Sequence, residues 1–164
     1  MTYRSFRVRP SPLPTGDQMP ETSQTVLIFE TPAGDPPVEF LGDSSDIVYF
    51  ISMAHSERYG AEHPLAKASS IIKRRLRVAM GPLLNFGDAA AENAAEEELL
   101  ERLWQDAAGL AECARSVASA IDSDEELREM TSALPELPER LRELAAMADW
   151  ADEQGAQVRL TFVL

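Results

Sequence analysis

The sequence predicts an α+β fold in which a small, mostly antiparallel sheet packs against four to five helices. Strand-like segments gather near the two ends of the chain, whereas helical periodicity fills the middle. The two kinds of segment do not alternate, and this segregation is typical of α+β rather than α/β proteins. Three N-terminal strands and one C-terminal strand are expected to form the sheet.

Three of the four predicted strands lie in the first part of the chain. Phe6 and Val8 alternate with two arginines, which is the period of a half-buried strand. Three prolines then begin a polar stretch, and we expect an irregular loop over residues 10–24. Residues 25–30 (TVLIFE) are branched and aromatic, as in a buried strand, and residues 38–41 (VEFL) follow a turn, so we expect a hairpin.

The clearest strand is expected at residues 158–164 (VRLTFVL), where apolar and polar side chains alternate. An open edge of such alternating apolar residues would invite aggregation. We therefore expect this strand to pair with the N-terminal strands.

Five helical segments are expected between the strands. They cover residues 43–59, 64–83, 88–121, 123–134 and the stretch between Pro138 and Gly155. Each has apolar residues in steps of three and four, with turn or cap residues at its ends. Asp106 is the one polar residue on the apolar stripe of the third helix.

Size and composition indicate one domain that spans residues 1–164. A chain of 164 residues with 45% hydrophobic and 26% charged residues can bury a core of its own. A single cysteine, Cys113, excludes an intramolecular disulfide. No apolar stretch approaches the roughly 20 residues of a membrane helix, so we expect a cytoplasmic protein without a membrane partner.

The net charge of −13 is unevenly distributed. Residues 1–86 contain nine basic and nine acidic residues, whereas the rest contains six basic and nineteen acidic ones. The acidic half would repel phosphate backbones, so general nucleic-acid binding is not expected. An alternative hypothesis is an inhibitor that imitates a nucleic acid with a row of carboxylates. The densest row is Glu92, Glu96, Glu97, Glu98, Glu101 and Asp106.

No motif in the chain identifies a catalytic reaction or a cofactor. Neither nucleotide-binding glycine pattern is present, nor is the serine nucleophile elbow. His55, Glu57 and His63 are weak candidates for a metal site, but their spacing matches no known ligand set. We therefore interpret the chain as non-enzymatic, with a metal-dependent enzyme that uses these three residues as one alternative.

The most informative constellation is basic. Lys67, Lys73, Arg74 and Arg77 fall on the predicted second helix, with Arg75 among them, and Arg58 falls at the end of the first. On a helical wheel Lys73 and Arg77 pair at i, i+4. They could bind an anion or an acidic partner. They could also form the counter-surface to this protein's own acidic helices, and we favour this structural interpretation.

Taken together, the sequence predicts a non-catalytic protein-interaction module, such as an adaptor, regulator or assembly factor. Its partner would be another protein or a second copy, since the alanine-rich third helix slightly favours a homodimer over a monomer. The main alternative is a sensor of small anionic ligands. Its pocket would lie between the sheet and the second helix, lined by Tyr49, Phe50 and the basic residues.

Overall fold

The computed structural model describes residues 25–55 and 63–163, and it confirms the α+β class. Helices make up most of this part of the chain, and three short strands form one sheet. In chain order the elements are β1 (Val26–Glu30), α1 (Ser45–His55), α2 (Pro64–Ser70), the π-helical turn η1 (Ile71–Arg75), α3 (Gly81–Leu84), β2 (Phe86–Asp88), α4 (Ala94–Glu101), α5 (Ala107–Ser123), α6 (Glu125–Met130), α7 (Leu137–Glu153) and β3 (Arg159–Val163).

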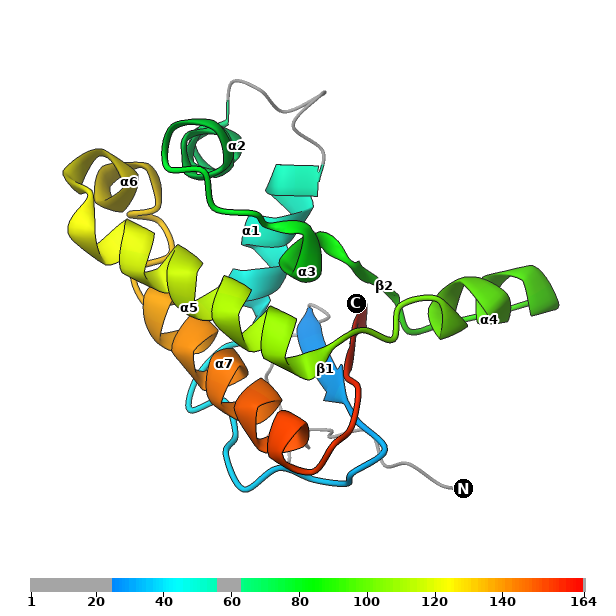
Figure 1. Cartoon of the computed structure of the whole chain (residues 1–164). Coiled ribbons are helices and arrows are strands. Elements are labelled where there is room, and N and C mark those ends of the chain that lie inside the picture. Colours follow the sequence, from blue (N-terminus) through cyan, green and yellow to red (C-terminus); the bar gives the residue numbers. More distant parts are fainter. Residues whose placement is uncertain (1–24, 56–62, 164) are drawn as a thin grey trace, which may run out of the picture.

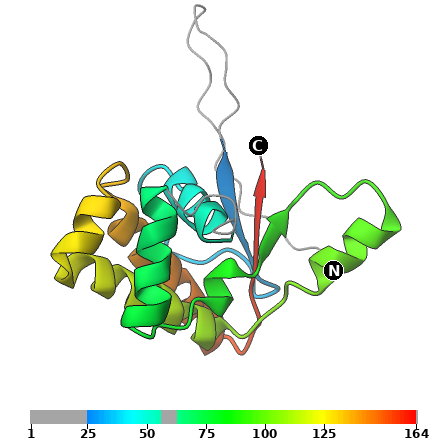
Figure 2. The same cartoon turned by 90° about the horizontal axis from the view of Figure 1, so that it is seen from above.

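Most helices gather on one side of the sheet, and α4 stands apart on the other side. Figure 1 shows α5 and α7 lying along each other, with α1, α2 and α3 behind and above them. The view from above places the three strands between this helical layer and α4 (Figure 2). The sheet therefore separates a large helical core from a single projecting helix.

The core lies between the sheet and the α5–α7 pair. The apolar stripe of α5 is buried as expected, and Leu110, Val117 and Ile121 are among its buried residues. The inward residues of α7 include Leu141 and Leu144, which have no exposed surface. The spacing of three and four that predicted these two helices is thus also the spacing of their buried faces.

The sheet is mixed and has three strands in the described part of the chain, which corrects the expected four-stranded, mostly antiparallel arrangement. The C-terminal strand is confirmed, and it occupies the centre of the order β1-β3-β2. Its antiparallel register with β1 pairs Glu30 with Arg159. Its other neighbour is β2, which runs parallel and was not expected as a strand. The strand expected around Phe6 and Val8 and the loop over 10–24 lie outside the described residues.

Residues 38–41 are not a strand, so the predicted hairpin with β1 is wrong. At this edge of the sheet, the backbone N–H of Leu27 donates instead to Oγ of Ser44 at 3.0 Å. A side chain thus supplies the acceptor that a neighbouring strand would have supplied. Val38 and Phe40 still pack against the core as partly buried residues, so their alternation reflects burial without strand pairing.

The predicted helix over 88–121 is in fact β2, α4 and α5. Asp106 is the N-cap of α5, where its carboxylate accepts the N–H of Gly109 at 2.9 Å. An aspartate in this position starts a helix, which explains the polar residue on an apolar stripe. The next helix also begins one residue later than expected, because Asp124 rather than Ser123 accepts the N–H of Leu127.

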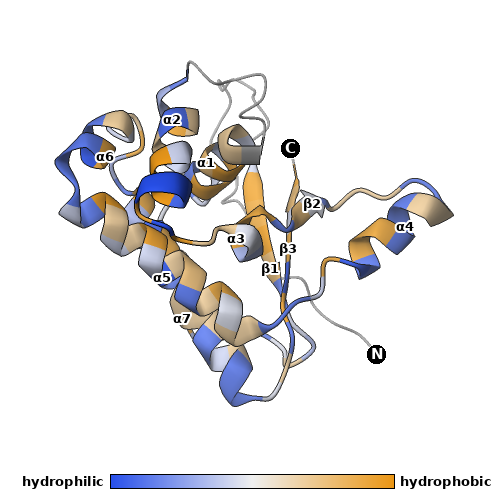
Figure 3. Ribbon diagram, turned by 45° about the horizontal axis from the view of Figure 1, so that its top comes forward, coloured by the Kyte–Doolittle hydropathy of each residue, from blue (hydrophilic) through white to orange (hydrophobic). Residues whose placement is uncertain are grey.

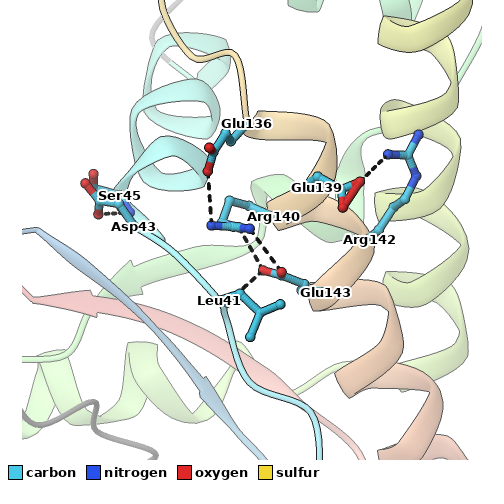
Figure 4. A network of polar contacts seen from close by, with 8 residues as sticks. All are labelled: Leu41, Asp43, Ser45, Glu136, Glu139, Arg140, Arg142 and Glu143. Atoms are coloured by element: carbon cyan, nitrogen blue, oxygen red, sulfur yellow. Dashed lines mark hydrogen bonds and ion pairs between the residues drawn. The ribbon is translucent and has the colours of Figure 1, made fainter.

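A buried arginine joins the loop before α1 to α7. Arg140 is 5% exposed, and its Nε lies 2.7 Å from Oε1 of Glu143. The same oxygen accepts the backbone N–H of Leu41 at 3.3 Å, and Glu136 lies on the other side of the guanidinium (Figure 4). Arg140 and its partner Glu143 thus connect α7 to this loop. At Gly42 the loop backbone passes so close to Arg140 that there is no room for a side chain.

Replacing Gly42 with alanine is expected to destabilise the fold by about 1–3 kcal/mol, the usual cost of overpacking. The added Cβ would lie 1.8 Å from Nη1 of Arg140, whose ion pair with Glu143 keeps it from moving aside. Urea unfolding measures the change. The matched control is Gly81→Ala, where a Cβ meets nothing within 4 Å. Equal stability of the two variants would contradict a tight contact at Gly42.

Candidate functional site

The basic residues predicted from sequence lie around a turn that ends the second helix. We call residues 73–77 the basic turn. The α-helix α2 widens into η1, where the N–H of Leu76 donates to the carbonyl of Ile71 at 3.1 Å. The N–H of Val78 then donates to the carbonyl of Ile72 at 3.0 Å and closes the end. This widening corrects the expected regular helix through residue 83.

Arg77 stands in a left-handed conformation, with φ of 58°. It is the one non-glycine residue with positive φ in the described part of the chain. Glycine usually occupies this position after a helix, because a Cβ there crowds the backbone. An arginine in its place costs about 1 kcal/mol. The expected i, i+4 pairing of Lys73 and Arg77 on one helix face is therefore wrong, since Arg77 lies beyond the helix.

Arg75 is the member of the basic turn that this protein's own acidic helix neutralises. Its guanidinium contacts Asp124 and Glu126 of the α6 region, both at 3.0 Å. The hydrogen bond from the backbone N–H of Leu127, together with the nearby Arg75, lowers the pKa of Asp124. The favoured structural interpretation of the basic run thus holds for Arg75.

Arg74 and Arg77 are exposed, as Arg75 is, but unlike Arg75 neither has an ion pair among residues 25–55 and 63–163. With Lys73 they border an open hollow of about 550 Å³, whose other walls include Val78 and Met80. Leu76 is 37% exposed between them. Figure 3 shows this turn as the strongly hydrophilic segment between α2 and α3.

Guanidinium groups at such a hollow can form paired hydrogen bonds with carboxylates or phosphates. The apolar wall beside them was not expected from sequence. The sequence Leu76-Arg77-Val78 could have indicated this wall, because two apolar residues follow the end of the helix where a glycine is usual. The remaining basic candidates lie elsewhere: Lys67 is exposed on α2, and Arg58 lies outside the described residues.

Of the predicted histidine cluster, the structure describes the side chain of His63 alone. His63 is the N-cap of α2, and its Nδ1 accepts the backbone N–H of Leu65 at 3.1 Å. His55 is the last residue of α1, and Glu57 lies outside the described residues. No group of three or more potential metal ligands occurs among the residues that were placed. A capping role accounts for His63.

The pocket expected between the sheet and the second helix is not lined by Tyr49 and Phe50 together. Phe50 has no exposed surface, whereas its neighbour Tyr49 on α1 is 52% exposed. One of these rings belongs to the core and the other to the surface.

The acidic row is divided among several structural roles. The carboxylate of Glu96 accepts the N–H of Glu92, and Asp106 caps α5. Glu98 pairs with Arg102 at 3.2 Å along α4. Several of the carboxylates that would imitate a nucleic acid thus have local partners.

Comparison of the chain with protein-family models, curated proteins and solved structures gives no match. Among the described residues, no helix has the length and apolarity needed to cross a membrane. Any functional conclusion therefore depends on the geometry of the surface itself.

Cys113 lies next to the basic turn, but its environment makes the thiol a poor nucleophile. It is 5% exposed on α5, and its thiol donates to the carbonyl oxygen of Ala79 at 3.3 Å. Burial raises the pKa of the Cys113 thiol to about 11. Since the thiolate is the nucleophile, this environment disfavours covalent chemistry at Cys113.

Alkylation of Cys113 in the folded protein is expected to be very slow near neutral pH. With a pKa of about 11, only about one thiol in a thousand is ionised at pH 8. The iodoacetamide reaction rate should rise about tenfold per pH unit up to pH 10, and urea should restore the rate of a free thiol. Fast alkylation of folded protein at pH 8 would show that the thiol is accessible and ionised.

Proposed function

We propose that this protein is a non-catalytic protein-interaction module whose basic turn binds an acidic segment of another protein or of a second copy. The observation that supports the proposal most is the left-handed Arg77, exposed in a chain with a net charge of −13. Local backbone strain that a glycine would relieve is a feature of binding and catalytic sites. The guanidinium at this position compensates for that strain only if it has a partner outside the fold.

The neighbouring cations do not all require a partner. Lys73 and Arg74 lie in the last turn of the helix, where positive charge stabilises the negative end of the helix dipole. Arg75 has its own acidic partners in α6. Arg77 follows the last helical residue, so neither explanation applies to it directly.

The surface around Arg77 has the composition of a small interface. Half-buried Val78 lines the hollow beside the cations and would become buried under a bound segment, and Leu76, which precedes Arg77 in the chain, is exposed. Interfaces are enriched in arginine and place apolar contacts at their centre and polar contacts at the rim. With a single buried cysteine, a reducing cytoplasmic setting remains part of the proposal.

A second candidate function is the binding of a small anionic ligand in the same hollow. The observation that favours it is the size of the hollow, about 550 Å³, which lies within the range of small-molecule sites. The two functions require the same cations but different probes. A short polyglutamate peptide represents the acidic partner, and pyrophosphate represents the small anion.

Arg77→Gly is expected to stabilise the fold and weaken binding at the same time. Glycine removes the left-handed strain, so the free energy of unfolding should rise by about 1 kcal/mol. The loss of the guanidinium should weaken the binding of a polyglutamate peptide about tenfold at low salt, measured by calorimetry. Arg102→Gly is the matched control, since Arg102 is an exposed arginine on the distant helix α4.

Each measurement has an outcome that contradicts the proposal. Unchanged peptide binding by Arg77→Gly, or an equal loss in Arg102→Gly, would show that the basic turn is not the contact surface. Tight pyrophosphate binding with no peptide binding would favour the second function. Sedimentation equilibrium tells a second copy from another partner, since a mass of 18.1 kDa at all salt concentrations identifies a monomer.

A further inference from the structure

The projecting helix α4 has an apolar surface that the described core does not cover. None of its eight residues is buried, and Leu99 is 58% exposed. An isolated helix of this length is not stable in water, because nucleation is unfavourable and few hydrogen bonds follow. Its N-cap at Asn93 contributes only part of the missing stability. The position of α4 therefore indicates a contact that covers its inner face.

That inner face forms a groove with the outer strand of the sheet. Leu99, Leu100 and Leu103 line one side of a hollow of about 460 Å³, and Phe86 and Gly87 line the other. A Cβ at Gly87 would lie 3.1 Å from Cδ1 of Leu103, so the glycine lets the helix end approach the strand closely. The apolar part of its lining comes from Phe86, Ala90, Leu99, Leu100 and Leu103.

The segment that forms the groove is acidic overall. Between residues 88 and 102 there are six carboxylates and one basic residue, Arg102, which pairs with Glu98. Asp88 and Glu96 line the groove itself, together with Arg102. An occupant that fits this surface has apolar side chains on one face and cations on the other.

We propose that the groove between β2 and α4 binds the N-terminal segment of the same chain, residues 4–9. This segment has the required chemistry, because Phe6 and Val8 alternate with Arg7 and Arg9. Residues 1–16 contain three arginines and no acidic residue. The most basic stretch outside the basic turn thus complements the most acidic stretch of the chain.

The chain length permits this contact without changing the described fold. Residue 9 is seventeen positions before the start of β1, which an extended chain spans at up to about 55 Å. The order β1-β3-β2 places the groove about two strand spacings from β1, or roughly 10 Å. The groove and the basic turn are lined by different residues, so a test of this contact does not depend on the proposed function.

Disulfide trapping in the full chain tests the proposal directly. In a Cys113→Ala background, Val8→Cys combined with Leu99→Cys should oxidise to a product that migrates as a monomer, since the Cα atoms must approach within about 7 Å. The control combines Val8→Cys with Ser132→Cys, an exposed residue beside Leu134 and Pro135. Equal oxidation of the two pairs would overturn the proposal. A dimeric product alone would assign the groove to a second copy and overturn binding in cis.

Hydrogen exchange provides a second measurement that needs no cysteine. Arg7→Glu with Arg9→Glu should speed exchange of the amides in residues 86–103 about tenfold, with those of α5 and α7 unchanged. The control, Ser11→Glu with Thr15→Glu, adds carboxylates beside the segment and should leave this exchange unaltered. If the arginine variant leaves it unaltered too, the segment does not occupy the groove.

Discussion

The buried ion pair between Glu30 and Arg159 is the interaction on which the arrangement of the sheet and α4 depends. The two side chains are 7% and 5% exposed, and Nε of Arg159 lies 2.5 Å from Oε1 of Glu30. Removing one partner of such a pair commonly costs 3–5 kcal/mol, about a third or more of the stability of a typical domain, because the other charge is left buried. The pair therefore adds a second constraint on the register of β1 against β3, beside the one that the buried apolar face provides.

The same arginine also holds the chain that leaves α4. Its Nη1 donates to the carbonyl of Leu100 at 3.2 Å, and its guanidinium carbon lies 4.5 Å from the ring centroid of Trp104. Cation–aromatic contacts are stronger when they are removed from water, as this one is. One side chain thus connects the central strand, its antiparallel neighbour and the end of the projecting helix. The face of the sheet opposite the helical core is built around this charge.

Sequence periodicity predicted two kinds of element. These are elements that pack against segments close in sequence, and elements with one apolar face and one polar face. The alternation at residues 158–164 and the stripes of α5 and α7 are of these kinds, and all are present. The strand β2 has only three residues, one of them Gly87, so it has no periodic pattern to detect. It exists because β3 offers it a parallel neighbour 74 residues later in the chain, a constraint that no local pattern contains.

The candidate site shows the same division between composition and geometry. The sequence identified the cations of the basic turn, but a helical wheel placed Lys73 and Arg77 on one face, because it assumed a regular helix. The π-helical widening and the left-handed Arg77 change which charges meet, so that Arg75 faces α6 while Arg77 faces the hollow. The net charge of −13 likewise does not show how many carboxylates already cap helices or pair with arginines. Charge becomes informative about partners only after these internal uses are identified, and they include both carboxylates that line the groove, since Asp88 accepts the N–H of Ala90 and Glu96 that of Glu92.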